Sequence, residues 1–322
     1  MHWYHNQKFN INFNLLKSAE WTVNNGVRQG GILSPYLFNI YVNELIDNIS
    51  SMSIGCNLGY LKSNIIAYAD DVVLLSPSLS GLQNLINAFD NNINIINLHI
   101  NSNKSVCMKF SKTMAPLIVN SQVFCGDSLL KFVDEIKYLG FIITSNLCNQ
   151  KDIIFNRNKF YKQFNVTIRK FSNCNINVLV NLFNTYCLQI YGSNLWFGNF
   201  RCKRQLDQFA VGYHKAIKKI LKVPYGASNH DCCEILGLLT FKHFLNSARL
   251  KFILRILKIP CVFISKIVPF LKIKSICFNE LELLFKDVYN VNNILDNDKE
   301  ALIARIFYID RREPRSNYIT LV

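Results

Sequence analysis

Hydrophobic positions repeat with helical spacing in two parts of the first half of the chain. One apolar face is formed by Leu37, Phe38, Tyr41, Leu45 and Ile46. Ser34-Pro35 predicts where this helix begins, with Ser34 as the N-cap and Pro35 in the first helical position. A longer amphipathic helix is predicted by the spacing of Leu82, Leu85, Ile86, Phe89, Ile93 and Ile96.

Between these two helices the sequence changes to a strand pattern. Residues 64–75 predict a hairpin, because Ile-Ile-Ala-Tyr-Ala and Val-Val-Leu-Leu flank Asp70-Asp71 at a tight turn. Three further strands are expected near residues 106–110, 119–124 and 136–143. Up to about residue 145, the pattern is therefore a mixture of helix and strand.

The chain beyond residue 145 is predicted to be mainly helical. One apolar stripe consists of Leu206, Phe209, Tyr213, Ile217 and Ile220. Lysines recur three or four residues apart on another face of the same helix: Lys215, Lys218, Lys219 and Lys222. Two interpretations of this lysine face remain open, a solvated charged surface and a surface that contacts phosphates.

Charge and cysteine content limit the class of protein. The 322 residues carry 36 Lys and Arg against 21 Asp and Glu, a net charge of +15, which favours a polyanionic partner such as nucleic acid. A solubility charge or a preference for membrane surfaces are the alternatives. The 11 cysteines form no Cys-x-x-Cys pair, so a reducing compartment is expected. His230, Cys232, Cys233 and His243 approach a metal cluster most nearly, but their spacing matches no zinc finger.

Address signals are not evident in the sequence. The N-terminus lacks the apolar core of a signal peptide, and the most apolar stretch, residues 252–273, is interrupted by charged residues and a proline. We therefore expect no membrane association and an intracellular location, in the nucleus or the cytoplasm, without a recognisable targeting signal. Nothing in the sequence points to a protein partner.

Asp70 and Asp71 are the strongest candidates for chemistry. Adjacent like charges beside apolar strands repel each other, and a divalent cation would relieve that repulsion. Such an ion could activate a hydroxyl and stabilise a reacting phosphate. An ordinary turn that uses Asp for its own backbone hydrogen bonds is the alternative.

Four motifs in a fixed order favour the first interpretation. They are Gly26-Val27-Arg28-Gln29-Gly30-Gly31-Ile32-Leu33-Ser34-Pro35, Tyr68-Ala69-Asp70-Asp71, Asn101-Ser102-Asn103-Lys104-Ser105 and Lys137-Tyr138-Leu139-Gly140. In this order and spacing the sequence resembles the reverse transcriptases of non-LTR (LINE-type) retrotransposons. The resemblance continues through residues 182–187 and 191–196 and weakens after about residue 245.

The resemblance implies a role for each motif. Asp70 and Asp71 would hold Mg²⁺ or Mn²⁺, and Lys104 would lie near the triphosphate as a proton donor to the leaving pyrophosphate, although it could equally be an ordinary surface lysine. The family implies that Arg28, Gln29, Gly30 and Tyr68 contact the incoming nucleotide and the template. Tyr138, Leu139 and Gly140 would belong to a hairpin that grips the primer end. The implied partners are an RNA template, a DNA primer and deoxynucleoside triphosphates.

The resemblance also implies a fold class, α+β. Residues 1–145 would form a partial polymerase palm, an antiparallel sheet with packed helices, without fingers and without the first catalytic strand. Residues 146–322 would form a mostly α-helical thumb and C-terminal region.

The site is expected to be incomplete. The family supplies a third carboxylate from a strand well before the Gly26 segment, and Glu20 does not match that position. We therefore expect an N-terminally truncated RNA-directed DNA polymerase that is inactive alone. The alternative is a retrotransposon remnant that binds nucleic acid without catalysis.

Overall fold

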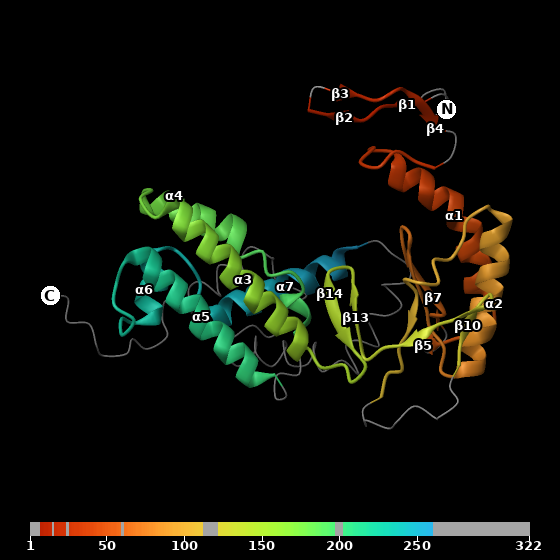
Figure 1. Cartoon of the computed structure of the whole chain (residues 1–322). Coiled ribbons are helices and arrows are strands. Elements are labelled where there is room, and N and C mark those ends of the chain that lie inside the picture. The colour runs from red at the N-terminus through yellow and green to blue at the C-terminus, as the bar shows by residue number, and fades with distance from the viewer. Residues whose placement is uncertain are drawn as a thin grey trace. The chain divides into compact units, whose positions relative to one another are not determined.

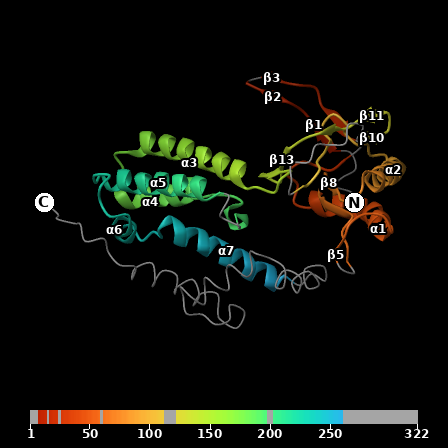
Figure 2. The same cartoon turned by 90° about the horizontal axis from the view of Figure 1, so that it is seen from below.

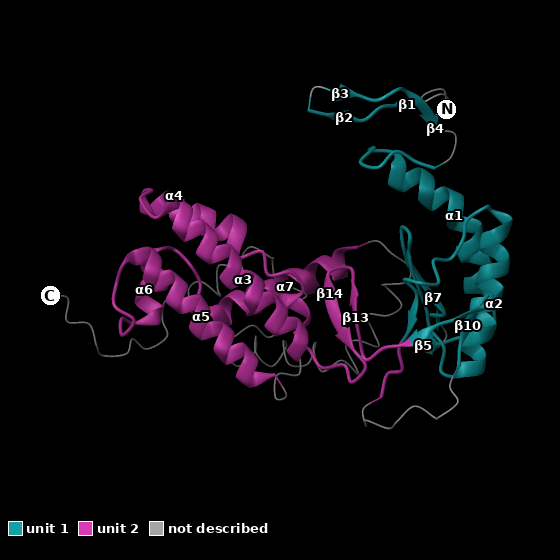
Figure 3. Ribbon diagram, in the orientation of Figure 1, with its two compact units in different colours: residues 1–107, 118–131 teal, residues 108–117, 132–322 magenta. Residues whose placement is uncertain are grey.

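The computed structural model describes residues 7–14, 16–23, 26–58, 61–111, 122–196 and 202–259. The chain divides into two compact units, residues 1–107 with 118–131 (unit 1) and residues 108–117 with 132–322 (unit 2), coloured separately in Figure 3. Helices and short strands are mixed, as an α+β protein requires (Figure 1).

The strands that the structure describes are short. In unit 1 they are β1 (Gln7–Phe9), β2 (Asn12–Phe13), β3 (Leu16–Lys17), β4 (Trp21–Val23), β5 (Asn57–Leu58), β6 (Leu61–Lys62), β7 (Ile65–Tyr68), β8 (Asp71–Leu74), β9 (Val106–Cys107), β10 (Phe124–Cys125) and β11 (Ser128–Leu129). β12 (Lys131–Phe132) lies at the boundary, and β13 (Glu135–Tyr138) and β14 (Phe141–Thr144) belong to unit 2. Antiparallel pairs join β1 to β4, β2 to β3, β5 to β6, β7 to β8, β10 to β11 and β13 to β14.

Helices contribute most of the packing surface. Unit 1 contains α1 (Ser34–Ser51) and α2 (Leu79–Ile95). Unit 2 contains α3 (Gln150–Phe171), α4 (Ile176–Leu182), a π-helical turn (Phe183–Cys187), a 3₁₀ turn (Ser193–Leu195), α5 (Lys203–Leu221), α6 (Asn229–Ile235) and α7 (Phe241–Lys258). Among these described helices, none is long and apolar enough to cross a membrane.

The core of unit 1 is small. Leu45 and Ile49 of α1 pack against Leu85 and Phe89 of α2, and one face of the β7–β8 hairpin covers this cluster. Ser78 caps α2, because its side chain accepts a hydrogen bond from Gly81 N at 3.1 Å. The two helices therefore form a platform for the hairpin that carries Asp70 and Asp71.

The core of unit 2 is larger and rich in aromatic rings. α3, α4 and α5 lie side by side (Figure 2) and enclose Phe160, Phe183, Phe209 and Tyr213. The rings of Phe160 and Phe209 are 5.4 Å apart between centroids, within the range of favourable aromatic contacts. Burial of such large side chains gives unit 2 a strong source of stability.

Two predictions about local structure are wrong. Ser34 is not the N-cap of α1: Leu33 takes that position, and the buried Ser34 hydroxyl donates to the carbonyl of Arg28. Residues 136–143 are not one strand but most of the β13–β14 hairpin, because Leu139 and Gly140 take positive φ angles of 46° and 83° and reverse the chain.

Several other predictions are confirmed or lie partly outside the described residues. The helices expected around residues 82–96 and 206–220 are α2 and α5. The hairpin expected at residues 64–75 is β7–β8, although its turn consists of Ala69-Asp70, one residue earlier than expected. The strands expected near 106–110 and 119–124 are reduced to β9 and β10 among the residues described, and residues 119–121 and 260–273 lie outside them.

Candidate active-site hairpin

The β7–β8 hairpin presents its two carboxylates at an exposed tip. Tyr68 pairs with Asp71 across the strands, and Ala69 and Asp70 form the connecting turn, with Ala69 at φ 51°. Cross-strand partners lie on the same face of a hairpin. Tyr68 and Asp71 therefore share the outer face, and both are exposed, as is Asp70.

The opposite face of this hairpin is held by the core of unit 1. Ile65, Val72 and Leu74 alternate with the outward residues and pack on the cluster of α1 and α2. Because strand side chains alternate between faces, this packing fixes Asp71 on the solvent side. The register of the hairpin thus decides that the acids point away from the core.

A buried asparagine at the start of the hairpin anchors it to α1. Asn64 is 1% exposed, and its Nδ2 donates to the carbonyls of Ile49 at 2.7 Å and Ile54 at 3.2 Å. Gly55 lies against it with φ 117°, and a Cβ at that position would lie 2.3 Å from the Asn64 Cβ. The sequence analysis did not identify Asn64 or Gly55 as supporting residues, and the available signal was the pair of glycines at positions 55 and 59, which is typical of a turn.

The donor set at the tip suits a divalent cation only in part. Carboxylate oxygens are the ligands that Mg²⁺ and Mn²⁺ prefer, and Asp70 and Asp71 are exposed and adjacent. Within the described part of the chain, however, they do not belong to a group of three or more His, Cys, Asp or Glu ligand atoms. The pair can therefore offer oxygen ligands to one ion, with the remaining positions left to water or substrate.

The glycine segment before α1 forms an exposed turn. Arg28, Gln29 and Gly30 are all exposed, and Gly30 has φ 79°, which favours glycine. Gly31 N donates to the Arg28 carbonyl at 3.1 Å, and the Ser34 hydroxyl donates to the same carbonyl. Ser34 therefore ties the turn to the first residues of α1.

Lys104 lies in a turn directly before β9. Its backbone N–H donates to the carbonyl of Asn101 at 3.0 Å and its side chain is exposed. Arg28, Gln29, Gly30, Tyr68, Asp70, Asp71 and Lys104 all belong to unit 1.

The second candidate hairpin, β13–β14, belongs to unit 2. Leu139 and Gly140 form its turn, between the paired residues Tyr138 and Phe141. A Cβ on Gly140 would lie 3.3 Å from the ring of Tyr191, so the turn packs closely on the segment before the 3₁₀ turn. Tyr138 is half-buried, whereas Leu139 and Gly140 are exposed.

A fully buried carboxylate fastens β13–β14 to the helical part of unit 2. Asp152 is 0% exposed; Oδ1 accepts from Ile142 N at 3.0 Å and Oδ2 accepts from Trp196 Nε1 at 2.7 Å. Burial raises the pKa of the Asp152 carboxyl above its ordinary 3.8, while the hydrogen bonds from Ile142, Trp196 and Asn156 act in the opposite direction. Sequence analysis missed Asp152, because no local pattern indicates a buried hydrogen-bond acceptor.

A basic groove lies between α3 and α5 of unit 2. Its volume is about 840 Å³, and it is lined by Arg157, Tyr161, Lys203, Arg204, Asp207, Gln208 and Val211. Three cations against one carboxylate favour an anionic ligand. The sequence analysis had assigned no role to these residues.

The lysine face of α5 is divided between two environments. Lys218 is buried, and its Nζ donates to the Tyr225 carbonyl at 2.8 Å. Lys215 Nζ lies 5.8 Å from the centre of the Tyr225 ring, whereas Lys219 and Lys222 are exposed. Lys218 therefore holds the loop after α5. It belongs neither to a solvated charged surface nor to a surface that contacts phosphates.

Comparison with known proteins gives the class of protein. Residues 1–143 match the family model described as reverse transcriptase (RNA-dependent DNA polymerase). This stretch includes the glycine turn, the β7–β8 hairpin and Lys104. The first part of the chain is therefore similar to a reverse transcriptase domain.

Individual relatives identify the branch of that class. The chain is 34% identical over 134 residues to a Retrovirus-related Pol polyprotein from type-2 retrotransposable element R2DM of Drosophila melanogaster, covering 40% of this chain and 13% of the relative. It is 30% identical over 124 residues to the corresponding type-1 element R2 polyprotein of Popillia japonica, covering 37% and 17%. It is 23% identical over 246 residues to the RNA-directed DNA polymerase from mobile element jockey of Drosophila funebris, covering 71% and 25%.

The chain is thus related to the reverse transcriptases of non-LTR, LINE-type retrotransposons, as the motifs predict. It spans between 13% and 25% of the length of these relatives. Proteins of this family generally depend on divalent metal ions.

Proposed function

We propose that this chain is part of an RNA-directed DNA polymerase of a non-LTR retrotransposon, with Asp70 and Asp71 as its metal-binding carboxylates. The β7–β8 hairpin carries this proposal, because its register places both acids at an exposed tip within the matched reverse transcriptase domain. Residues 1–145 would correspond to a partial palm that comprises unit 1 and the β13–β14 hairpin of unit 2, and the helices of unit 2 would correspond to the thumb and C-terminal region.

Asp70 and Asp71 would hold Mg²⁺ or Mn²⁺. A bound divalent ion supplies Lewis acidity for attack of a primer hydroxyl on the triphosphate. Lys104, exposed in the turn before β9, would donate a proton to the leaving pyrophosphate. Each of these groups reaches solvent without rearrangement of the core of unit 1.

The glycine turn and Tyr68 would contact the nucleotide and the template. Gly30 leaves the backbone accessible, and Arg28 and Gln29 offer exposed donors on the same turn. Tyr68 would stack near the base pair from the face of the hairpin that it shares with Asp71. These contacts would position the incoming deoxynucleotide.

Unit 2 would contact the template–primer duplex. Tyr138, Leu139 and Gly140 would grip the primer end, with the turn supported by Tyr191. The groove containing Arg157, Lys203 and Arg204 would contact duplex phosphates, which position a nucleic acid without reading its sequence.

Primer extension tests the catalytic part of the proposal. The full chain is incubated with a primed RNA template, four deoxynucleotides and either Mg²⁺ or Mn²⁺. We expect weak incorporation at most, because two carboxylates support one ion better than two. Incorporation should disappear in Asp70→Asn and persist in Asp127→Asn, a matched control in which the exposed acid lies in the β10–β11 turn of the same unit.

The result separates the two candidate functions. Strong synthesis that requires Asp70 would contradict the expected incompleteness but support the polymerase. Duplex binding without incorporation under either metal favours the non-catalytic remnant. Binding is measured across a salt series, because phosphate contacts release counterions and weaken with salt. A flat salt response would exclude both functions.

A further inference from the structure

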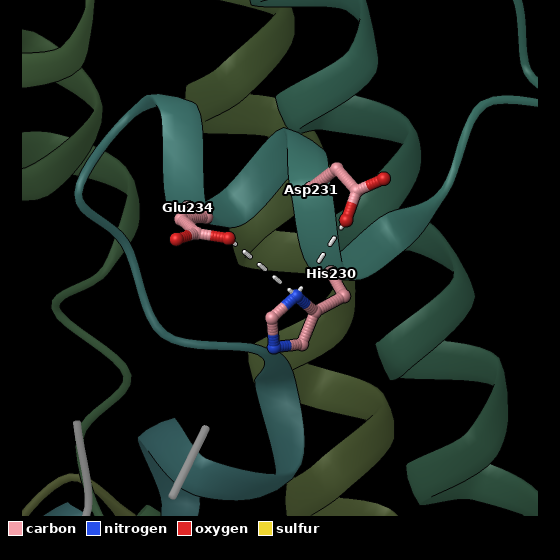
Figure 4. Close-up of side chains that lie close together, drawn as sticks. All are labelled: His230, Asp231 and Glu234. Carbon is pink, nitrogen blue, oxygen red and sulfur yellow. Dashed lines mark ion pairs between the residues drawn. The ribbon is translucent and has the colours of Figure 1, made fainter. Parts of the chain in front are cut away.

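A histidine and two carboxylates converge on α6, far along the sequence from the candidate polymerase residues. His230, Asp231 and Glu234 each direct one metal-binding atom toward a common point (Figure 4). The three ligand atoms lie within 4.8 Å of one another. Among the described residues this is the one group of three or more such ligands.

The distances within the cluster suit a shared cation better than hydrogen bonds. His230 Nδ1 lies 3.7 Å from Asp231 Oδ1 and 3.9 Å from Glu234 Oε2, both longer than an ordinary hydrogen bond of about 2.7–3.2 Å. Ligand atoms bound tetrahedrally at about 2.0–2.2 Å from Zn²⁺ are roughly 3.3–3.6 Å apart. The two distances from His230 Nδ1 exceed this spacing by a few tenths of an ångström, and the two carboxylate oxygens lie within 4.8 Å of each other, so side-chain rotations of Asp231 and Glu234 would bring the three atoms around one ion.

The three side chains of the cluster are partly buried, but the cluster still reaches solvent. The side chains of His230, Asp231 and Glu234 retain 12%, 19% and 35% of their exposure. Asp231 Oδ1 is shielded from solvent and accepts no hydrogen bond. A shielded carboxylate oxygen without a hydrogen bond is costly, and a bound cation would compensate it. Glu234, the most exposed of the three, leaves a route for an ion and for water as a further ligand.

Simpler explanations account for part of this arrangement. The Ser228 hydroxyl accepts a bond from Asp231 N at 3.4 Å, so Asp231 occupies the third position of a capped helix, where acids are common. Capping does not explain why the carboxylates of Asp231 and Glu234 both lie beside the imidazole Nδ1 of His230 (Figure 4). The nearby ammonium of Lys218, which disfavours a cation, donates to the Tyr225 carbonyl instead.

We propose that His230, Asp231 and Glu234 form a binding site for a transition-metal ion of the Zn²⁺ class. An imidazole nitrogen beside carboxylates selects Zn²⁺, Co²⁺ or Ni²⁺ over Mg²⁺, which prefers oxygen ligands alone. Cys232 and Cys233 lie between the ligands in sequence but are buried in the aromatic core. The site thus differs from the cysteine-containing grouping considered from sequence, and it is separate from the proposed Mg²⁺ or Mn²⁺ site.

Metal titration of the full chain tests this site without any activity assay. Zn²⁺ binding is followed by calorimetry, and Co²⁺ binding by its visible absorption, which reports coordination geometry. We expect saturation at one ion per chain and an affinity for Zn²⁺ at least a hundredfold above that for Mg²⁺. Glu234→Gln, which keeps the size of the side chain, should weaken Zn²⁺ binding at least tenfold, and His230→Ala should abolish it.

Two controls distinguish this site from others. His99→Ala removes an exposed histidine of unit 1, and the double variant Asp70→Asn, Asp71→Asn removes the candidate catalytic acids. Both should bind Zn²⁺ as the unmodified chain does. Unchanged Zn²⁺ binding in Glu234→Gln, whose circular dichroism should match that of the parent, would overturn the proposal, as would the absence of saturable binding in the parent.

Discussion

The two hairpins with four-residue strands, β7–β8 in unit 1 and β13–β14 in unit 2, share one pattern of strand pairing. In each, four residues pair with four, a tyrosine ends the first strand, and two residues form the turn. The turns differ in chemistry: Ala69-Asp70 is exposed and acidic, whereas Leu139-Gly140 carries no charge and packs near Tyr191. The backbones of the turns differ too, since Leu139 and Gly140 both have a positive φ, whereas in the β7–β8 turn only Ala69 does.

The supports of the two hairpins differ as well. β7–β8 is fixed by a neutral buried amide, Asn64, against a small hydrophobic cluster with one aromatic ring. β13–β14 is fixed by a buried carboxylate, Asp152, against a large aromatic core. The hairpin with the candidate catalytic acids therefore packs on the smaller hydrophobic core. A mutation in unit 1 should change the stability of β7–β8 without changing that of β13–β14.

The largest effect is expected from Asp152→Ala. Truncation leaves the buried N–H groups of Trp196 and Ile142 without their acceptor, and each such loss costs about 1–3 kcal/mol. For the two groups together, we expect the free energy of unfolding of unit 2 to fall by about 2–6 kcal/mol. Denaturant unfolding followed by the fluorescence of the buried Trp196 measures it. A loss below about 1 kcal/mol would show that this carboxylate does not anchor the hairpin.

The pH dependence of stability is a second test of the role of Asp152. Because the folded pKa of Asp152 is raised, the folded state retains this proton over a range in which the unfolded state has lost it. The contribution is therefore fully present below the ordinary pKa of 3.8 and declines as pH rises through the raised pKa. Asp152→Asn should remove this part of the slope, and unchanged pH dependence in that variant would contradict the assignment.

Asn64→Ala should have the second largest effect. It removes the hydrogen bonds to the carbonyls of Ile49 and Ile54 and should destabilise the β7–β8 hairpin by about 1–3 kcal/mol. Hydrogen exchange is the suitable measurement, since the amides of β7 and β8 should exchange faster while those of β13 and β14 keep their rates. Equal acceleration in both hairpins would mean that they do not respond independently.

Substitutions in the two turns should change the stability of their hairpins in opposite directions. Gly140→Ala puts a Cβ on a residue at φ 83° and should destabilise β13–β14 by about 1–2 kcal/mol. Ala69→Gly relieves the positive φ of 51° and should stabilise β7–β8 by up to about 1 kcal/mol, less the entropy that glycine adds to the unfolded chain. Thermal melts of both variants provide the comparison, and a stabilising Gly140→Ala would refute it.

The smallest effect on stability is expected from the candidate catalytic acids. Asp70→Asn and Asp71→Asn change exposed side chains and should alter the free energy of unfolding by no more than about 0.5 kcal/mol. The same variants should reduce Mn²⁺ binding by the chain, which electron paramagnetic resonance detects. Unchanged Mn²⁺ binding in the double variant would argue against metal binding at this tip.

Sequence patterns predicted those parts of the structure that depend on local periodicity. α2, α5 and β7–β8 were predicted because their apolar residues repeat along a single element. The strand pattern missed the turn at Leu139, since leucine rarely adopts a positive φ and β-branched residues on both sides suggest a continuous strand. The family resemblance, by contrast, placed a hairpin at Tyr138, Leu139 and Gly140, and the structure has one there.

Long-range contacts explain what the sequence did not show. By spacing, Lys218 belongs to a basic helical face, yet its ammonium donates a hydrogen bond to the carbonyl of Tyr225. Asp152 meets Trp196 only through the fold. The roles assigned to Asp70, Asp71, Lys104 and the two turns came from family resemblance, and they remain predictions.

The contact between Gly55 and Asn64 has a consequence for how this domain can diversify. A Cβ at position 55 would lie 2.3 Å from the Asn64 Cβ, so any larger residue there must displace the asparagine that bonds to the end of α1. In related retrotransposons, residues 55 and 64 should therefore change together, and a change at only one of them should be rare. Gly55 and Asn64 should therefore vary less among related sequences than the exposed residues that flank the acidic tip.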